Sequence, residues 1–236
     1  MKVATWNIAG NQTYPDKLEN PEYFVKIIDE INPDILLLQE VHFKDNYSFS
    51  QKYFSNYKYI FNSPISDSHN NPQFKLGLSI LSKFEIINPE TFLLINPDLT
   101  KVQTDGKIIK SHDKAVQVCN INGINVANTQ LLPLHVFNTN YEKETIFTQQ
   151  LEGQLLSILK TPLIFAGDFN HPVPQDLFPG LFNKLAVKDC LSGEPTFIYK
   201  NSNPDHIFIS KDMKVSNSKI QKTKTDHYLC IVKIGV

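Results

Sequence analysis

Residues Leu163–Asn170 read Leu-Ile-Phe-Ala-Gly-Asp-Phe-Asn, an apolar run that ends in polar side chains. Four consecutive apolar residues are typical of a buried strand, so Gly167 and Asp168 stand where this strand should surface. The apolar run Ile35–Leu38 precedes Glu40 in the same way. The sequence therefore predicts two buried strands, each with a carboxylate at its carboxyl end.

The C-terminal part of the chain shows the reverse order. Asp205 precedes the apolar residues 207–209, and Asp226 and His227 precede the apolar segment 228–232. If these strands run antiparallel to the first two, their starts lie beside the other strands' ends, and the carboxylates meet at one rim. Crowded carboxylates raise one another's pKa values unless a cation lies among them. Oxygen ligands of this kind suit Mg²⁺ or Mn²⁺.

Two amphipathic helices are expected, because apolar residues recur at helical spacing over residues 24–31 and 142–160. Each precedes one of the two strands above, which predicts strand, helix, strand units. Further strands are predicted at 77–82, 116–119 and 124–128. Segments 63–75 and 96–113 have the polar composition of loops, and we expect them to lie over the functional site.

The composition indicates one domain over residues 1–236, since 41% of the residues are hydrophobic and 11% are aromatic. No apolar run approaches the roughly 20 residues of a membrane helix, and no signal-peptide profile is present, so we expect a soluble, cytoplasmic, monomeric protein without a membrane partner. The three cysteines are expected to be buried, reduced thiols. The net charge is −1 and all 23 basic residues are lysine, so charge alone does not indicate a nucleic-acid partner.

The ordered signatures Thr5-Trp6-Asn7, Leu38-Gln39-Glu40, Gly167-Asp168-Phe169-Asn170, Asp205-His206-Ile207 and Thr225-Asp226-His227 resemble the endonuclease/exonuclease/phosphatase superfamily. That superfamily includes exonuclease III type repair enzymes, deoxyribonuclease I, inositol polyphosphate 5-phosphatases and neutral sphingomyelinases. The resemblance covers nearly the whole chain. It implies a four-layer α/β/β/α sandwich of two mixed β-sheets flanked by helices, with the site at one rim.

The resemblance also implies residue roles. Glu40 would be the principal metal-binding carboxylate, with Asn7 beside it, and Asp226 would bind metal directly or through water. Asp168 would position or deprotonate the attacking water or protonate the leaving oxygen, and Asn170 would donate to a phosphoryl oxygen.

In the same family pattern, Asp205 would orient His227 and stabilise its charged form. The alternative interpretation of these residues is a set of polar strand ends and surface loops.

The sequence departs from the family pattern at Asn128-Thr129-Gln130-Leu131, where many members carry histidine in place of Gln130. Glutamine cannot become an imidazolium, although it can still donate a hydrogen bond to phosphate. His135 follows five residues later and could reach the site from the next loop. An engineered substitution at Gln130 is a third alternative.

Three other residues are candidates for substrate contacts. His42 follows Glu40 closely and His171 follows Asn170, so both could line the rim. Lys114 stands where a loop enters a strand and could neutralise a substrate phosphate. His206 should point away from the site by strand alternation.

A lysine-rich stretch over residues 211–224 leads to Asp226, and its side chains could contact the phosphate backbone of a nucleic acid. Aromatic residues over 43–61 could stack on unpaired bases, although several must belong to the core. We therefore expect an Mg²⁺- or Mn²⁺-dependent phosphodiesterase acting on nucleic acid, DNA in preference to RNA. The alternatives are a phosphomonoesterase or lipid or inositol phosphoesterase of the same fold, and a binding module weakened at Gln130.

Overall fold

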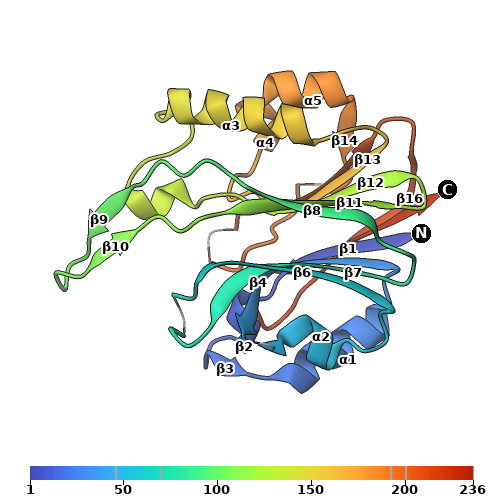
Figure 1. Cartoon of the computed structure of the whole chain (residues 1–236), viewed down its shortest axis with the longest axis horizontal. Helices are drawn as coiled ribbons and strands as arrows, with labels where there is room; N and C mark the ends of the chain where they lie inside the picture. Colours follow the sequence, from blue (N-terminus) through green and yellow to red (C-terminus); the bar gives the residue numbers. More distant parts are fainter. Residues whose placement is uncertain (46, 70, 192, 200, 236) are drawn as a thin grey trace.

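The computed structural model describes residues 1–45, 47–69, 71–191, 193–199 and 201–235. Two β-sheets lie face to face, with helices on both outer surfaces (Figure 1). This is the predicted four-layer α/β/β/α sandwich, and the fold prediction is confirmed. Both termini lie at one end of the sandwich, and a two-stranded hairpin extends from the other end (Figure 1).

The first sheet has the order β16-β17-β1-β4-β7-β6, with β5 paired to β4. In this sheet β1 and β4 run parallel, and the other pairs are antiparallel. The strands are β1 (Lys2–Asn7), β4 (Ile35–Lys44), β5 (Tyr47–Ser48), β6 (Tyr59–Asp67), β7 (Lys75–Ser82), β16 (Lys214–Gln221) and β17 (Leu229–Gly235).

The second sheet has the order β14-β15-β13-β12-β11-β8, in which β12 and β13 run parallel. Its strands are β8 (Ile87–Leu93), β11 (Ala115–Ile121), β12 (Ile124–Gln130), β13 (Leu163–Asp168), β14 (Val187–Asp189) and β15 (Asp205–Ser210). The predicted hairpin between β11 and β12 is present, with Asn122 and Gly123 at positive φ in its turn.

The helices form the two outer layers (Figure 1). Helices α1 (Pro21–Ile31) and α2 (Phe49–Tyr53) cover the first sheet, and α3 (Thr145–Ile158), α4 (Pro174–Leu177) and α5 (Pro179–Leu185) cover the second. Short 3₁₀ turns follow β1 and β12, as η1 (Ala9–Asn11) and η2 (Leu134–Phe137). Both helices predicted from apolar periodicity are therefore confirmed as α1 and α3. None of the helices in the described residues is long and apolar enough to cross a membrane.

The sandwich explains why the buried strands are apolar at successive positions. In β4, Ile35 and Leu37 pack in the layer between the sheets, whereas Leu36 and Leu38 pack against α1 and α2. Both faces of the strand are covered, and a continuous apolar run follows. The three cysteines are buried and unpaired, as expected.

Polar side chains tie the two sheets together just below the rim. Nε2 of Gln39 donates to Oγ1 of Thr5 at 2.9 Å and to Oδ1 of Asn128 at 2.7 Å. Nδ2 of Asn128 in turn donates to Oε1 of Gln117 at 3.1 Å. These groups are fully buried, so their hydrogen bonds offset the cost of removing them from water.

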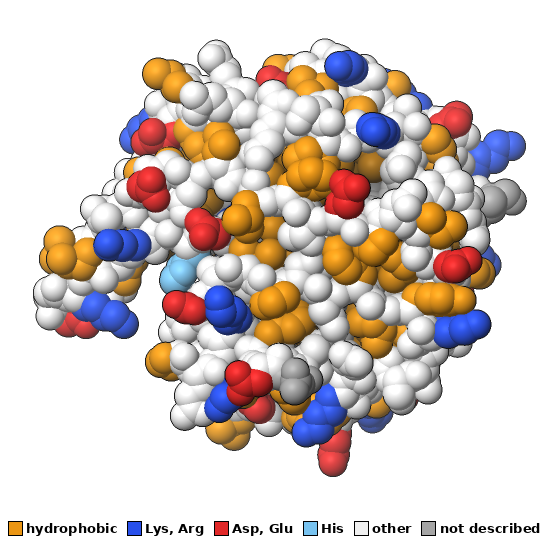
Figure 2. Space-filling view, in the orientation of Figure 1, with side chains coloured by type: hydrophobic (Ala, Val, Ile, Leu, Met, Phe, Trp, Pro, Cys, Tyr) orange, Lys and Arg blue, Asp and Glu red, His pale blue; other side chains and the backbone are white. Residues whose placement is uncertain are grey.

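The loop predictions were wrong in part. Segment 63–75 begins inside β6, and segment 96–113 contains the hairpin of β9 (Thr100–Val102) and β10 (Ile108–Lys110). This hairpin projects from the body and exposes apolar as well as basic side chains (Figure 2). A second small hairpin joins β2 (Gln12–Thr13) and β3 (Leu18–Glu19). In each hairpin, two very short strands pair with each other. The composition of a segment does not show such pairing.

Candidate active site

Three of the predicted residues form a row across the edge of the second sheet. Gln130, the last residue of β12, lies opposite Asp168, and Asp168 lies opposite Asp205, the first residue of β15. The ends of β12 and β13 and the start of β15 therefore meet, as the order of polarity in the sequence predicted. Gly167 makes this row possible. It has φ 145°, and a Cβ there would lie 1.9 Å from the carbonyl oxygen of Thr129 on the neighbouring strand.

Glu40 reaches the site from the first sheet through a β-bulge. Leu38 pairs with Ser79 and Val41 with Gly77, so the pairing register shifts between these residues, and Glu40 has φ 53°. Bulges of this kind re-aim a side chain beside an active site. The strand predicted to end at Glu40 in fact continues to Lys44, and the bulge turns the carboxylate toward the rim.

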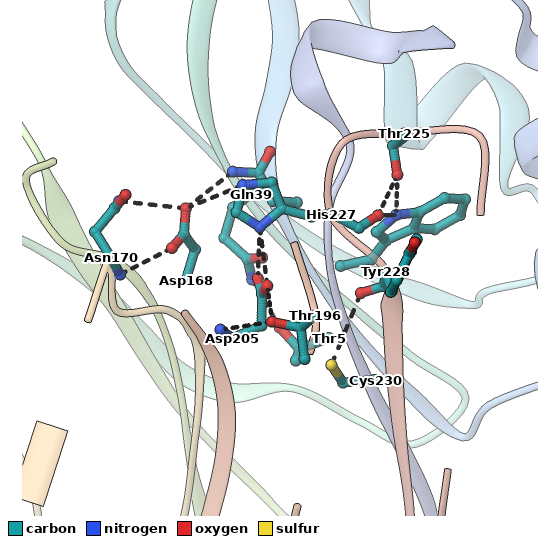
Figure 3. Close-up of polar contacts among 12 residues, drawn as sticks. Thr5, Gln39, Asp168, Asn170, Thr196, Asp205, Thr225, His227, Tyr228 and Cys230 are labelled. Carbon is teal, nitrogen blue, oxygen red and sulfur yellow. Dashed lines mark hydrogen bonds and ion pairs between the residues drawn. The ribbon is translucent and has the colours of Figure 1, made fainter. Parts of the chain in front are cut away.

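His227 lies between the two carboxylates of the second sheet (Figure 3). Its Nδ1 lies 2.9 Å from Oδ2 of Asp205, and its Nε2 lies 3.9 Å from Oδ2 of Asp168. Burial alone would lower the pKa of His227, but Asp205 and Asp168 outweigh it and raise the pKa to about 10. The imidazole is therefore a buried cation held between two anions.

Asp168 is a buried carboxylate whose pKa is raised toward neutrality. Burial raises the pKa of Asp168 to about 6, Asp205 adds to the rise, and His227 opposes it. Oδ2 of Asp168 accepts a hydrogen bond from Asn7 across the sheets at 3.1 Å. A buried carboxylate with a pKa near neutrality suits proton transfer.

Buried hydrogen bonds fix the histidine and its partner. Oγ1 of Thr196 donates to Oδ2 of Asp205 at 2.7 Å (Figure 3). The indole Nε1 of Trp6, on β1, donates to Oγ1 of Thr225 at 2.8 Å and to the carbonyl oxygen of His227 at 3.2 Å. The Thr-Trp-Asn and Thr-Asp-His signatures, far apart in the chain, therefore contact each other directly.

Glu40 is surrounded by donors. Nε2 of Gln130 donates to Oε1 of Glu40 at 2.7 Å, and Nδ2 of Asn7 donates to the same oxygen at 3.3 Å. Nζ of Lys114 donates to Oε1 of Gln130 at 2.7 Å, so Gln130 bridges the lysine and the glutamate. Burial opposes ionisation of Glu40, but Lys114, His69 and the Gln130 hydrogen bond outweigh it and lower the pKa of Glu40.

Asp226 has a buried oxygen that suits a cation. Among the described residues, its Oδ1 is one of five buried side-chain oxygen or nitrogen atoms without a hydrogen-bond partner. Burial raises the pKa of Asp226, and the nearby charge of Glu40 adds to the rise. Two neighbouring carboxylates supply oxygen ligands, which suit a hard divalent cation, so Glu40 and Asp226 fit the predicted metal-binding role. Asn7 lies beside them with its amide nitrogen toward Glu40, while its Oδ1 accepts a hydrogen bond from the backbone N–H of Ala9 at 3.0 Å.

A second group of titratable residues, Asp168, Asp205 and His227, has ligand atoms within 4.8 Å of one another. Its hydrogen bonds argue against a metal there. Nδ1 of His227 is engaged by Oδ2 of Asp205, and the same oxygen accepts from Oγ1 of Thr196, so these atoms already have protein partners.

Asn170 closes the site on the side of β13. It has φ 50°, and its backbone N–H donates to Oδ1 of Asp168 at 2.9 Å (Figure 3). Its Nδ2 donates to the carbonyl oxygen of Leu131 at 2.9 Å. This is the Asx-type turn that was the alternative interpretation. The turn also holds the side-chain amide beside Asp168, so the two interpretations are compatible.

The predicted rim histidines differ in position. His42 is fully buried, stacks on Phe74 with ring centroids 4.8 Å apart, and burial lowers its pKa to about 4. The expectation that His42 lines the exposed rim does not hold. The bulge at Glu40 inserts an extra residue, so side chains beyond it change faces relative to simple alternation.

His171 lies near the rim, with Nε2 3.1 Å from Oε1 of Glu142. His135 is exposed on η2. His206 is buried on the opposite face of β15, where its Nδ1 lies 2.7 Å from Oδ2 of Asp189, as strand alternation predicted.

Sequence reasoning missed Tyr14, which lies in the segment between β2 and β3. Burial, Asp226 and Glu40, in that order, raise the pKa of its phenol, and its side chain is hydrogen-bonded to Asp226. Its ring contacts Tyr199 edge-on with centroids 6.0 Å apart. Phe197, in the same loop as Tyr199, packs 4.9 Å from the ring of His227. The sequence around Tyr14 offers one weak signal, the proline that follows it, and Tyr14 belongs to no motif.

The sandwich and the acid, amide and imidazole groups at its rim define a class, the hydrolases of phosphate esters. The model of the endonuclease/exonuclease/phosphatase family matches residues 4–227, and the chain belongs to this family. The resemblance predicted from the motifs is confirmed. A search of curated proteins finds no match.

Solved structures share the fold at low sequence identity. An endonuclease/exonuclease/phosphatase family protein from Leptotrichia buccalis is 18% identical, with a TM-score of 0.69 and full coverage of both chains. An AP endonuclease from Archaeoglobus fulgidus is 15% identical, with a TM-score of 0.68 and full coverage of both chains. A mannosyl-6-phosphatase from Bacteroides thetaiotaomicron is 14% identical, with a TM-score of 0.63 and full coverage of both. The neighbours thus include both a nuclease and a phosphatase.

Proposed function

We propose that this chain is a divalent-metal-dependent phosphodiesterase that hydrolyses nucleic acid. The single observation that carries the proposal is the pairing of two unlike half-sites at one rim. One half is a protonated histidine between Asp168 and Asp205, and the other is the carboxylate pair Glu40 and Asp226. Hydrolysis of a phosphate ester needs both proton handling and neutralisation of charge on phosphorus oxygens.

Glu40 and Asp226 would hold Mg²⁺ or Mn²⁺, and Asn7 beside Glu40 would contact metal-bound water or phosphate. A bound divalent cation supplies Lewis-acid polarisation of a phosphoryl oxygen and neutralises developing negative charge. Tyr14 would position Asp226 through their hydrogen bond, and Gln130 would position Glu40. These residues act before the chemical step, by fixing the carboxylates.

The other half-site would handle charge and protons. The His227 imidazolium, oriented by Asp205, would contact a phosphoryl oxygen and stabilise the negative charge that builds there. Asp168 would accept the proton of the attacking water or donate one to the leaving oxygen, since its raised pKa permits either direction. The side-chain amide of Asn170 would donate to a second phosphoryl oxygen.

Nucleic acid is the preferred substrate class because exposed groups that suit it lie beside the site. Lys219, Lys222 and Lys224 are exposed and lead into the Asp226 segment, whereas Lys211 and Lys214 lie at the other end of β16, beside the C-terminal end of β17. Tyr199 is exposed beside Tyr14 and offers a ring for stacking on an unpaired base. If these lysines contact phosphates, the affinity for a DNA strand falls as the salt concentration rises. The slope of log affinity against log salt concentration should then be smaller in the Lys222→Gln variant.

The function is tested by hydrolysis of labelled single-stranded DNA, duplex DNA and RNA in Mg²⁺, Mn²⁺ or EDTA. We expect cleavage of DNA in either metal, none in EDTA, and none by the Asp168→Ala protein, which controls for contaminating nucleases. The pattern of products distinguishes endonuclease from exonuclease action. Failure to cut any nucleic acid with either metal contradicts the proposal.

A second candidate is a phosphomonoesterase that acts on a small phosphate ester. It is favoured by the near-neutral net charge of −1 and the complete lack of arginine, which give little long-range attraction to a polyanion. Metal-dependent release of phosphate from sugar phosphates, without cleavage of DNA or RNA, would establish this candidate instead.

A further inference from the structure

Two histidines near the site have no role in the chemistry described above. His69 lies in the segment between β6 and β7, and His112 lies between β10 and β11. Both side chains are exposed, and their rings are 6.0 Å apart between centroids. Two separate loops therefore place two imidazoles next to each other at the surface.

Lys114 joins this pair to the reaction site. It follows His112 by two residues, and its ammonium group lies 2.7 Å from Oε1 of Gln130, which in turn bonds Glu40. The charge of Lys114 lowers the pKa of His112 after the larger effect of burial, and His69 adds to the lowering. His69 also acts on Glu40. The two imidazoles and the ammonium group of Lys114 therefore lie near one another and near Glu40.

Acidic groups also face this cluster. Burial has the largest effect and lowers the pKa of His112, Lys114 and His69 lower it further, and Asp67 and Asp113 raise it. Asp113 is exposed and accepts a hydrogen bond from Nδ2 of Asn96 at 2.9 Å. The imidazole N–H groups and the ammonium group of Lys114 are hydrogen-bond donors, and an anion among them accepts several of these hydrogen bonds at once.

We propose that His69, His112 and Lys114 form an anion-binding subsite that holds a second phosphate group of the substrate, beside the phosphate that reacts near Glu40. The subsite lies where the β9–β10 hairpin joins the body, because His112 stands in the short segment between β10 and β11. The substrate class is then a phosphate ester with a neighbouring phosphate, such as one nucleotide linked or phosphorylated at its other hydroxyl. This inference rests on the proposed phosphoesterase function.

A binding experiment tests the subsite without catalysis. Thymidine 3′,5′-bisphosphate and thymidine 5′-monophosphate are titrated into metal-free protein in EDTA, and histidine ring signals are followed by NMR. Without metal, Glu40, Asp168 and Asp226 repel phosphate, so binding reports the basic groups. We expect the His69 and His112 signals to shift in both titrations. The bisphosphate is expected to bind at least about threefold more tightly, because its second phosphate offers another partner to the same donors.

The variants His69→Gln, His112→Gln and the double variant remove the histidine donors, and Lys184→Gln, exposed on α5, is the charge control. We expect each single variant to raise the Kd of the bisphosphate about threefold and the double variant about tenfold, with Lys184→Gln unchanged. Thermal unfolding checks that the fold is kept, as expected for exposed side chains. Unaltered binding by the folded double variant would overturn the subsite.

A kinetic experiment separates this inference from the proposed function. The substrates are the p-nitrophenyl ester of thymidine 5′-phosphate with and without a 3′-phosphate. In the double variant we expect KM to rise about tenfold for the 3′-phosphorylated ester only, with kcat within twofold. Equal KM changes for both esters would contradict the subsite. If neither ester is hydrolysed, the proposed function is in difficulty, and the binding experiment still decides the subsite.

Discussion

The two halves of the rim are held together in different ways. In the half built from Asp168, Asp205 and His227, buried hydrogen bonds from Thr196 and Asn7 engage both carboxylates and Asp205 engages the imidazole. In the half built from Glu40 and Asp226, a buried carboxylate oxygen has no partner. The polar groups of the first half are paired with one another, whereas a cation would complete the second half under the proposed function. Proton handling and metal binding should therefore respond to different substitutions.

The largest effect is expected from Asp205→Asn. The substitution removes the anion that holds the His227 cation, so kcat should fall about 10³-fold while the affinity for Mn²⁺ stays within twofold. The matched control is Asp189→Asn, which breaks the similar pair between Asp189 and His206 on the other face of β15 and should leave kcat unchanged. Steady-state kinetics and Mn²⁺ calorimetry provide the readouts. A loss of metal affinity in Asp205→Asn would contradict the separation of proton handling from metal binding.

The converse change is Glu40→Gln. A neutral amide is a poorer ligand for a hard cation, and we expect the Kd for Mn²⁺ to rise about 100-fold. Glu30→Gln, exposed on α1, is the control and should not alter the Kd. Calorimetry with MnCl₂ measures both. If Glu40→Gln binds Mn²⁺ like the parent protein, Glu40 is not a metal ligand and the separation of the two halves is contradicted.

The pH dependence should report the first half. If Asp168 accepts the proton of the attacking water, kcat/KM should fall tenfold per pH unit below about pH 6, where Asp168 becomes protonated, and above about pH 10, where His227 loses its proton. If Asp168 instead donates a proton to the leaving oxygen, kcat/KM should fall above about pH 6. In Asp205→Asn the main anion that raises the pKa of His227 is gone, and the alkaline limit should move down toward neutrality. A pH profile of residual activity checks this. An alkaline limit that does not move would assign it to another group.

A smaller effect is expected from Gln130→His, which restores the residue that many family members carry. Lys114 already places a cation beside Gln130, and the amide already bridges it to Glu40. We therefore expect kcat to change by less than tenfold, or about 1.4 kcal/mol of barrier. A rise of tenfold or more in single-turnover rate would mark Gln130 as a weakened position.

The smallest effect on catalysis is expected from His42→Gln, because this side chain is fully buried. The kcat should stay within twofold. Since burial lowers the pKa of His42 to about 4, the unfolded chain binds more protons between about pH 4 and 6.5, and the folded state loses stability as the pH falls. Urea unfolding should show a weaker pH dependence in His42→Gln. A large loss of kcat would indicate that His42 contacts the substrate, contrary to this expectation.

Much of the fold could be predicted from the sequence because the sandwich buries both faces of its central strands. Residues 35–38 and 163–166 are apolar throughout for that reason, and α1 and α3 each bury one face and show it as periodicity. The β9–β10 hairpin could not be predicted, since its exposed Val102 and Ile108, 66% and 62% exposed, pack against no core.

The site could be predicted where a motif residue meets another motif residue, as Asp168 and Asp205 do through strand register. It could not where local backbone geometry decides. The bulge at Glu40 reverses the face of His42, and Tyr14 reaches Asp226 from a small hairpin. Gln39 and Asn128 stand inside the motifs, and the hydrogen bond between their side chains ties the two sheets together. Long-range pairing of polar groups leaves no periodic trace in sequence.

The central claim is that the cation binds in the Glu40 and Asp226 half and not beside His227. The most direct measurement is anomalous diffraction from crystals of the full chain grown with MnCl₂. The account predicts one strong anomalous peak within coordination distance, about 2.0–2.3 Å, of carboxylate oxygens of Glu40 and Asp226. A peak coordinated by His227 and Asp205 instead, or no peak at saturating Mn²⁺, would contradict it.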